Sequence, residues 1–268
     1  MIRSSFFTVY NIRQFTAYEY NQLIKHGLDP KTLSTEVDDD IPVEYIIGYA
    51  NFRGKDFIVD KNTLIPRVET EEIIDLGLDF VTSDSITFCD IGCGSGAIGI
   101  SFAIELLAKS INFEGYLSDL SESALEVAKK NSDILLNPIH QNCFTNKIQN
   151  SQLKIINSDL FKNYPSKKKF NIIFANLPYI PSDRVPVLAN SVKNYEPISA
   201  LDGGKDGLRI ISKLLVESKQ RLELNGVVIL EVDDSHTDTS KFENEWIIEV
   251  RKDQNQNTRF WILKLKNE

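Results

Sequence analysis

The sequence predicts an α/β protein with one doubly wound, mostly parallel sheet. Short apolar runs typical of buried strands alternate with longer stretches in which apolar residues recur at helical spacing. A glycine-rich turn at residues 92–96 joins one such strand to the next helix. Polar residues stand where several strands end, and open α/β sheets bind ligands at that edge. With 268 residues, the chain can form one large domain and a small one.

Composition and charge narrow the class of protein. The formal net charge of −8 argues against direct nucleic-acid binding, because nucleic-acid-binding proteins usually present a basic face. No apolar run approaches the roughly 20 residues that span a bilayer, and the first residues lack the apolar core of a signal peptide. Cys89, Cys93 and Cys143 are too few and too irregularly spaced for a disulfide framework or a zinc site. We therefore expect a cytoplasmic protein without a metal site or membrane contact.

Two small units precede the main domain. Residues 1–41 are predicted to form a short N-terminal helical segment that ends in an acidic linker. Residues 42–62 contain two strand-like runs around Arg53 and Gly54, which indicates a β-hairpin linker. The main domain then spans residues 63–268.

The entry to the main domain predicts a capped helix. Pro66 stiffens the chain, and either Glu69 or Thr70 is placed to cap the helix. Ile73 and Leu76 belong to the apolar face of that helix.

A strand at residues 86–90 leads directly into the glycine-rich turn. Glycine lets the backbone approach a nucleotide-type ligand closely, and a helix begins at Ala97 immediately afterwards. A purely structural tight turn is the alternative interpretation. The candidate ligand-binding residues here are Asp90, Ile91, Gly92, Cys93 and Gly94.

Two aspartates follow the next two predicted strands. The Asp119 carboxylate can accept hydrogen bonds from both hydroxyls of a ribose; alternatively, Asp119 or Ser121 caps the following helix. Asp159 can accept a hydrogen bond from an adenine amino group, with Leu160 against the ring. An ordinary turn residue is the alternative for Asp159.

An apolar run at residues 172–175 ends in Asn176, Leu177, Pro178 and Tyr179. Proline ends the strand because it has no N–H to donate. A carboxamide offers both an acceptor oxygen and a donor NH₂, so it can bind another amide or an amino group on a base. We hypothesise that this tetrapeptide holds the acceptor nitrogen of a methyl transfer; a loop that only turns the chain is the alternative.

The remaining elements complete the α/β alternation. The connection at residues 180–207 is long, and loops of this length are often functional. A helix is predicted from residue 208, followed by strands at 227–232, 246–250 and 259–265.

Together these motifs resemble the class I S-adenosylmethionine-dependent methyltransferases. Within them, the chain is similar to the peptide chain release factor glutamine methyltransferase family (PrmC/HemK), over residues 42 to about 231. The resemblance lies in Thr-Leu-Ile-Pro-Arg at 63–67, Asp-Ile-Gly-Cys-Gly-Ser-Gly at 90–96, Asn-Leu-Pro-Tyr at 176–179 and the Glu-Pro pair at 196–197. Leu177 stands where the family usually has a proline, and the N-terminal segment is shorter than the family's.

The resemblance implies a seven-stranded, Rossmann-like sheet whose last strand is antiparallel, with S-adenosyl-L-methionine as cofactor. It implies that residues 90–94 line the methionine part of the cofactor, that Asp119 holds the ribose and that Leu160 lies beside the adenine. Asn176 would touch both cofactor and substrate, and Leu177, Pro178 and Tyr179 would complete the catalytic and substrate-binding site.

The implied reaction is methylation of the glutamine side-chain amide in the Gly-Gly-Gln loop of a peptide chain release factor, by a monomeric enzyme. Three alternatives stay open. One is methylation of a ribosomal-protein glutamine, and another is methylation of an adenine amino group in nucleic acid, which presents the same planar NH₂. The third is a nicotinamide-dependent oxidoreductase or a cofactor-binding protein without catalysis.

Overall fold

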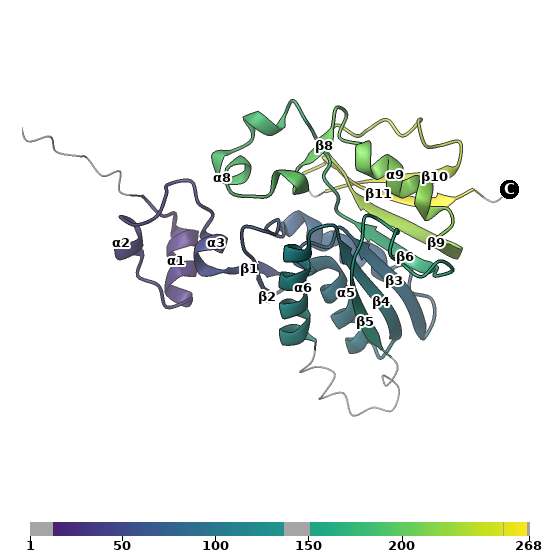
Figure 1. Ribbon diagram of the computed structural model, residues 1–268, viewed down its shortest axis with the longest axis horizontal. Coiled ribbons are helices and arrows are strands. Elements are labelled where there is room, and N and C mark those ends of the chain that lie inside the picture. The colour runs from purple at the N-terminus through teal and green to yellow at the C-terminus, as the bar shows by residue number, and fades with distance from the viewer. Residues whose placement is uncertain (1–12, 137–150, 254, 267–268) are drawn as a thin grey trace, which may run out of the picture.

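The computed structural model describes residues 13–136, 151–253 and 255–266, and a seven-stranded sheet forms its centre (Figure 1). The strands are β3 Ser85–Ile91, β4 Asn112–Asp119, β5 Gln152–Asn157, β6 Phe170–Ala175, β9 Leu222–Glu231, β10 Trp246–Lys252 and β11 Thr258–Leu265. They lie in the order β10-β11-β9-β6-β3-β4-β5. β11 pairs antiparallel with β9 and β10, and the other pairs are parallel. The predicted sheet with an antiparallel last strand is confirmed.

Helices cover both faces of this sheet because side chains along a strand point alternately to its two faces. Phe88 and Phe174 belong to the core on one face, which is covered by the helices that begin at residues 72, 97 and 122. Cys89 and Ile173 belong to the core on the other face, which is covered by the helix that begins at residue 209. The helices are α4 Glu72–Leu78, α5 Ala97–Ala108, α6 Glu122–Leu135 and α9 Arg209–Ser218.

The strand register brings the predicted site residues to one edge. Ile91 at the end of β3 pairs with Ser118 of β4 on one side and with Ala175 of β6 on the other. The glycine-rich turn, Asp119 and Asn176 therefore leave three neighbouring strands at the same level.

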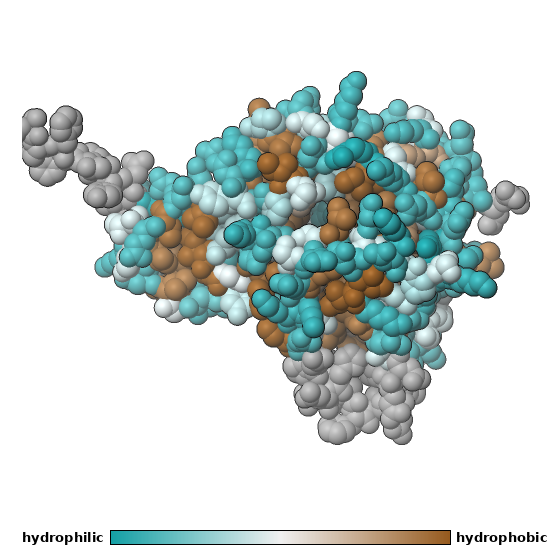
Figure 2. All heavy atoms as spheres, viewed as in Figure 1, coloured by the Kyte–Doolittle hydropathy of each residue, from teal (hydrophilic) through white to brown (hydrophobic). Residues whose placement is uncertain are grey.

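The N-terminal helices form a lobe beside the sheet (Figure 1). They are α1 Ala17–Lys25, α2 Pro30–Leu33 and α3 Val43–Ile47, and the hairpin strands β1 Tyr49–Phe52 and β2 Lys55–Ile58 follow. A capping box between Thr16 and Glu19 starts α1. Figure 2 shows apolar residues gathered over this lobe, and α1 leaves Ile24 exposed. The predicted helical segment and hairpin are both present.

The hairpin is packed into the main domain. Phe52 and Phe57 are fully buried in the core beside α5, and the Asn131 side chain of α6 bonds both the N–H (2.7 Å) and the carbonyl oxygen (2.9 Å) of Ile58. The division of the chain at residues 41 and 62 stays a prediction.

The predicted cap of α4 is wrong. Residues Val68–Glu71 form a 3₁₀ turn before the helix, and neither this turn nor α4 begins with a side-chain cap. Thr70 lies inside the turn, where it is buried and its hydroxyl faces Asn176 at 3.5 Å. Because the Thr70 hydroxyl points toward Asn176, it does not accept a hydrogen bond from the first N–H groups of α4.

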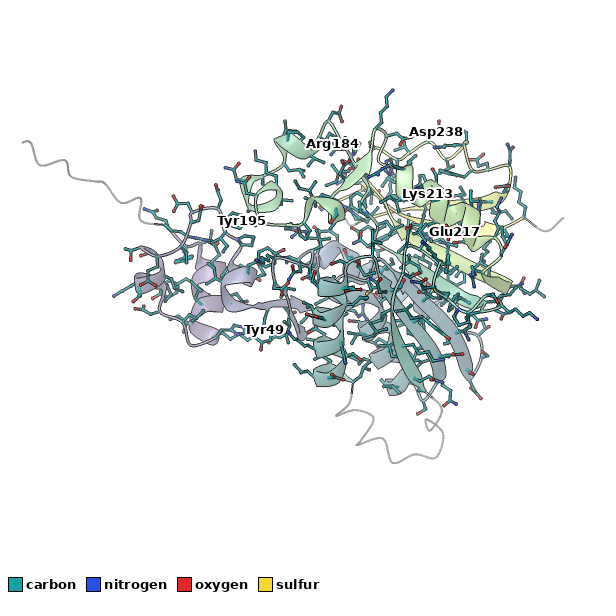
Figure 3. The ribbon with its side chains drawn as sticks, in the orientation of Figure 1. Tyr49, Arg184, Tyr195, Lys213, Glu217 and Asp238 are labelled. Carbon is teal, nitrogen blue, oxygen red and sulfur yellow. The ribbon has the colours of Figure 1, made fainter. Side chains whose placement is uncertain are left out.

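The long connection after β6 has structure of its own. Its ends, β7 Ile180–Pro181 and β8 Asp202–Gly204, pair in parallel, and it carries the short helix α8 Asn190–Lys193. Asn190 donates a hydrogen bond of 3.0 Å to Asp40, and Tyr195 faces the N-terminal lobe (Figure 3). The connection that leaves the sheet after β6 therefore contacts the N-terminal lobe.

His140 and Cys143, to which we assign no chemistry, lie outside the described residues. Cys89 and Cys93 are buried free thiols. Within residues 13–136, 151–253 and 255–266, no helix has the length and apolar character needed to cross a membrane.

Candidate active site

A cavity of about 380 Å³ opens at the carboxyl ends of β3, β4 and β6. This volume is within the range of small-molecule sites. Asp90 and Tyr179 are not among the residues that line it, and all the other predicted site residues form part of the wall. Those wall residues are Ile91, Gly92, Cys93, Gly94, Asp119, Leu160, Asn176, Leu177 and Pro178.

The glycine-rich turn forms one side of this cavity with its backbone. Gly92 and Gly94 have φ angles of 71° and 53°, values that L side chains rarely adopt. The N–H groups of Gly92 and Cys93 both donate to the Ser118 carbonyl oxygen, at 2.8 and 2.9 Å. A Cβ atom on Gly92 would lie 2.8 Å from Cδ2 of Leu177. The turn is therefore fixed to β4 and packed against the tetrapeptide.

Asp90 is a fully buried carboxyl group beneath this turn. Its Oδ2 accepts a hydrogen bond of 2.9 Å from the Gly99 N–H of α5, and its Oδ1 has no partner among the described residues. Burial raises the pKa of Asp90 to about 7. In the structure Asp90 ties the strand to the helix, and its contact with the cofactor stays a prediction.

Asp119 lies on the cavity wall and is tied to the turn. Its Oδ2 accepts from the Gly94 N–H and its Oδ1 from the Ser121 N–H, each at 2.9 Å. Burial raises the pKa of Asp119. The cap of α6 is Ser121, whose hydroxyl accepts from the Ala124 N–H. Each Asp119 oxygen therefore has a further lone pair that neither of these bonds uses, and its contact with a ribose stays a prediction.

Leu160 supplies an apolar wall in a constrained conformation. Its φ angle is 49°, which is uncommon for a residue other than glycine. The Ser158 hydroxyl donates to the Leu160 carbonyl oxygen at 2.7 Å and holds this turn. Asp159 also lines the cavity, so a flat ring there would meet both a carboxylate and an apolar surface.

The Asn176 carboxamide has a defined orientation at the cavity wall. Its Nδ2 lies 3.1 Å from Oε2 of Glu231 and 3.5 Å from the Thr70 hydroxyl. A carboxylate only accepts hydrogen bonds, so the NH₂ group is the end that faces Glu231. The Tyr179 hydroxyl donates to the other oxygen, Oε1, of Glu231 at 3.1 Å. The Asn176 Oδ1 oxygen is left on the opposite side.

Sequence reasoning did not identify Glu231 or Thr70 as site residues. The sequence feature that could have identified Glu231 is its position, because this acidic residue directly follows the apolar run of β9. Sequence reasoning also placed the hairpin outside the site, whereas Phe52 lines the cavity. Arg67 forms an ion pair with Glu196, so the motif at residues 63–67 contacts the Glu-Pro pair at residues 196–197.

The wall suits S-adenosylmethionine. The open glycine backbone admits an extended ligand, Asp119 offers acceptors for hydroxyls, and Leu160 offers an apolar face for a base. Asp119 also supplies an acidic group on the wall for a ligand that carries a cationic sulfonium. The chain's own residues therefore fit this cofactor.

Comparison with known proteins agrees with the geometry. A family model described as ribosomal protein L11 methyltransferase (PrmA) matches residues 74–248. A release factor glutamine methyltransferase of Clostridium acetobutylicum is 36% identical over 219 residues, 80% of this chain and 71% of the relative. Another of Lactococcus lactis is 33% identical over 228 residues, 83% of this chain and 77% of the relative.

Solved structures share the fold at low identity. The catalytic domain of hMettl16, in complex with a MAT2A 3′UTR hairpin, has a TM-score of 0.57 at 13% identity, covering 79% of this chain and 76% of that one. Human methyltransferase 10 domain containing protein has a TM-score of 0.52 at 13% identity, covering 80% and 90%. From the identity and coverage of the bacterial relatives, the chain belongs to the release factor glutamine methyltransferase family of S-adenosylmethionine-dependent methyltransferases.

Proposed function

We propose that this chain methylates the side-chain amide nitrogen of the glutamine in the Gly-Gly-Gln loop of peptide chain release factors. The observation that carries the proposal is the orientation of Asn176 at the cavity wall. Its NH₂ group is held by Glu231, so its oxygen is available to accept from another amide. The bacterial relatives named for this activity support the substrate assignment.

We infer that the part of the cavity formed by residues 91–94, Asp119 and Leu160, here called the cofactor half, would bind S-adenosylmethionine. When bound, it supplies a methyl group on a sulfonium whose leaving group departs without charge. Backbone atoms of residues 91–94 would contact the methionine part. Asp119 would accept from the ribose hydroxyls, and Leu160 would pack on the adenine. Each of these residues lines the cavity.

The acceptor half orients the glutamine amide. An amide nitrogen is a poor nucleophile because its lone pair is delocalised, so the chain must position this nitrogen rather than deprotonate it beforehand. The Asn176 Oδ1 and the Leu177 carbonyl oxygen would accept the two amide hydrogens. Orientation of this kind supplies roughly 7–11 kcal/mol in favourable cases. Tyr179 would support the tetrapeptide through its bond to Glu231.

A glutamine of a ribosomal protein is the second candidate substrate. The observation that favours it is the match of residues 74–248 to the ribosomal protein L11 methyltransferase model. An adenine amino group would present the same planar NH₂ to Asn176, but the net charge of −8 opposes approach of nucleic acid.

The test is transfer of labelled methyl from S-adenosylmethionine to the matching release factor. A second release factor, in which the loop glutamine is replaced, is assayed in parallel. We expect label on the first protein and none on the second. Label on both would place the methyl elsewhere, and label on ribosomal protein alone would favour the second candidate.

Location and assembly are also proposals. We infer a cytoplasmic, monomeric enzyme, because its proposed substrate acts in translation and one chain provides both halves of the cavity. Sedimentation of the purified protein tests the monomer.

A further inference from the structure

Glu231 is a buried carboxylate directly behind the acceptor half of the cavity. It ends β9, and only 1% of its surface is exposed. Oε2 faces the Asn176 NH₂ group at 3.1 Å, and Oε1 faces the Tyr179 hydroxyl at 3.1 Å. Two members of the tetrapeptide therefore meet on a single side chain from a neighbouring strand.

A buried charge is expensive unless it is paired and hydrogen-bonded. The Arg259 Nη1 atom of β11 lies 3.8 Å from Oε1 and supplies the opposite charge on the Tyr179 side. On the Asn176 side, no described residue forms an ion pair with Oε2. A neutral side chain of the same size would fill this space at lower desolvation cost, so the structure retains a carboxylate where packing does not require one.

The chemical difference between a carboxylate and an amide gives a reason for a carboxylate at position 231. Burial raises the pKa of Glu231, whereas hydrogen bonds from Thr70 and Tyr179 and the nearby Arg259 charge favour its ionised form. The ionised carboxylate has only acceptors, so the carboxamide opposite turns its NH₂ group inward. The oxygen of Asn176 then points away from Glu231. An acceptor in that position suits a substrate amide, whereas an NH₂ group would repel the substrate's N–H bonds.

We propose that Glu231 is a positioning residue that sets the direction of the Asn176 carboxamide and so makes the site accept an amide N–H donor. This inference rests on the proposed function, since it assigns a reason for the acceptor orientation. We expect the loss of this role to lower turnover rather than cofactor affinity, because Glu231 is not among the residues that line the cavity.

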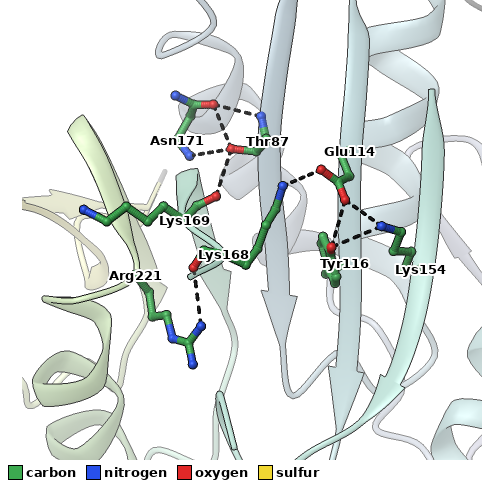
Figure 4. A network of polar contacts seen from close by, with 8 residues as sticks. All are labelled: Thr87, Glu114, Tyr116, Lys154, Lys168, Lys169, Asn171 and Arg221. Carbon is green, nitrogen blue, oxygen red and sulfur yellow. Dashed lines mark hydrogen bonds and ion pairs between the residues drawn. The ribbon is translucent and has the colours of Figure 1, made fainter. Parts of the chain in front are cut away.

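The network around Glu114 provides a control within the same sheet (Figure 4). Glu114 lies near the start of β4, where it pairs with Lys154 and Lys168 and accepts from the Tyr116 hydroxyl at 2.8 Å. Unlike Glu231, it is partly exposed and pairs with two lysines, and it lies at the amino end of its strand, away from the cavity. Glu114→Gln therefore tests the loss of a structural carboxylate in the same sheet.

The first variant is Glu231→Gln, which keeps size and shape. Because Arg259 lies beside Oε1, the glutamine oxygen stays on that side and its NH₂ group faces Asn176. Two donors then oppose each other, and the Asn176 carboxamide turns its NH₂ group toward the substrate. We expect kcat for methylation of the release factor to fall about 10²-fold, as for loss of one oriented hydrogen-bonding group. The Kd for S-adenosylmethionine should change by less than about threefold.

The second variant is the reciprocal exchange Asn176→Asp with Glu231→Gln. The NH₂ group of the introduced glutamine would donate to one oxygen of the introduced aspartate, and the other oxygen would face the cavity as an acceptor. We expect this double variant to recover at least about tenfold of the kcat that Glu231→Gln loses. Recovery through exchanged partners is an outcome that a purely structural role would not give.

The outcomes separate the two hypotheses. If the wild-type protein transfers no label to the release factor, the proposed function is contradicted. The Glu231→Gln variant is then compared with the wild type on the ribosomal protein or other substrate that the wild type does label. If the wild type is active, the positioning role is overturned by any of three results: full kcat in Glu231→Gln, no recovery in the exchange variant, or an equal loss of kcat in Glu114→Gln.

Discussion

The two halves of the cavity are built in different ways. The cofactor half consists mainly of backbone from the turn at residues 91–96, fixed by bonds to the Ser118 carbonyl and the Asp119 carboxylate. The acceptor half consists of side chains from distant parts of the chain: the residue numbers of Asn176 and Glu231 differ by 55, and those of Asn176 and Thr70 by 106. The first half is mainly backbone of one short turn, whereas the second half is made of side chains from distant segments, so different substitutions should disable them.

Asn176→Ala should give the largest effect, because it removes the oriented acceptor and leaves the turn at residues 91–96 intact. We expect turnover to fall by at least about 10³-fold, while cofactor affinity changes far less. Turnover and the Kd for S-adenosylmethionine are measured on the same preparation, and a circular dichroism spectrum checks the fold. Full activity in this variant would remove Asn176 from the mechanism.

Gly92→Ala should disable the cofactor half. A Cβ there meets Leu177 at 2.8 Å, and the φ angle of 71° adds about 1–2 kcal/mol of strain. We expect the Kd for S-adenosylmethionine to rise about tenfold or more.

The matched control is Gly54→Ala in the hairpin turn. Gly54 has a φ angle of 69° and nothing within 4 Å of an added Cβ. It should lose similar stability and keep cofactor affinity. Equal weakening of cofactor binding in both variants would contradict a specific role for the turn.

Tyr179→Phe should have a smaller effect on the acceptor half. It removes one of the two donors of the tetrapeptide to Glu231 and leaves the Asn176 bond in place. We expect kcat to fall about fivefold, which corresponds to roughly 1 kcal/mol, the usual contribution of one hydrogen bond. A loss as large as that of Asn176→Ala would instead place the hydroxyl in direct contact with the reaction.

Asp90→Asn should act on stability rather than turnover. The pKa of Asp90 is raised from 3.8 to about 7, so between these values the folded protein keeps a proton that the unfolded chain has lost. Stability from this group is therefore lost as pH rises from about 4 to about 7. In Asp90→Asn, the difference in free energy of unfolding between pH 5 and pH 8 should shrink by about 2–3 kcal/mol. Urea titrations of both proteins at the two pH values measure it, and an unchanged difference would contradict the raised pKa.

The seven-stranded sheet and most residues of the cavity wall could be predicted from the amino-acid sequence. Strand and helix periodicity, the glycine-rich turn and the apolar run before Asn176 are local patterns, and local patterns decide local structure. Because parallel strands end at one edge of a sheet, these patterns also placed the turn, Asp119 and Asn176 together.

The orientation of the side chains in the acceptor half could not be predicted in the same way, because it depends on contacts between distant strands. Glu69 or Thr70 was expected to cap α4, but the Thr70 hydroxyl instead faces Asn176. Phe52 of the hairpin also lines the cavity, a contact that the sequence pattern did not indicate. The direction of the Asn176 carboxamide depends on which atoms lie opposite it, and Glu231 comes to that place only when β9 pairs with β6. Hydrogen bonds between such distant residues leave no periodic trace in the sequence, so their partners are defined only by the folded chain.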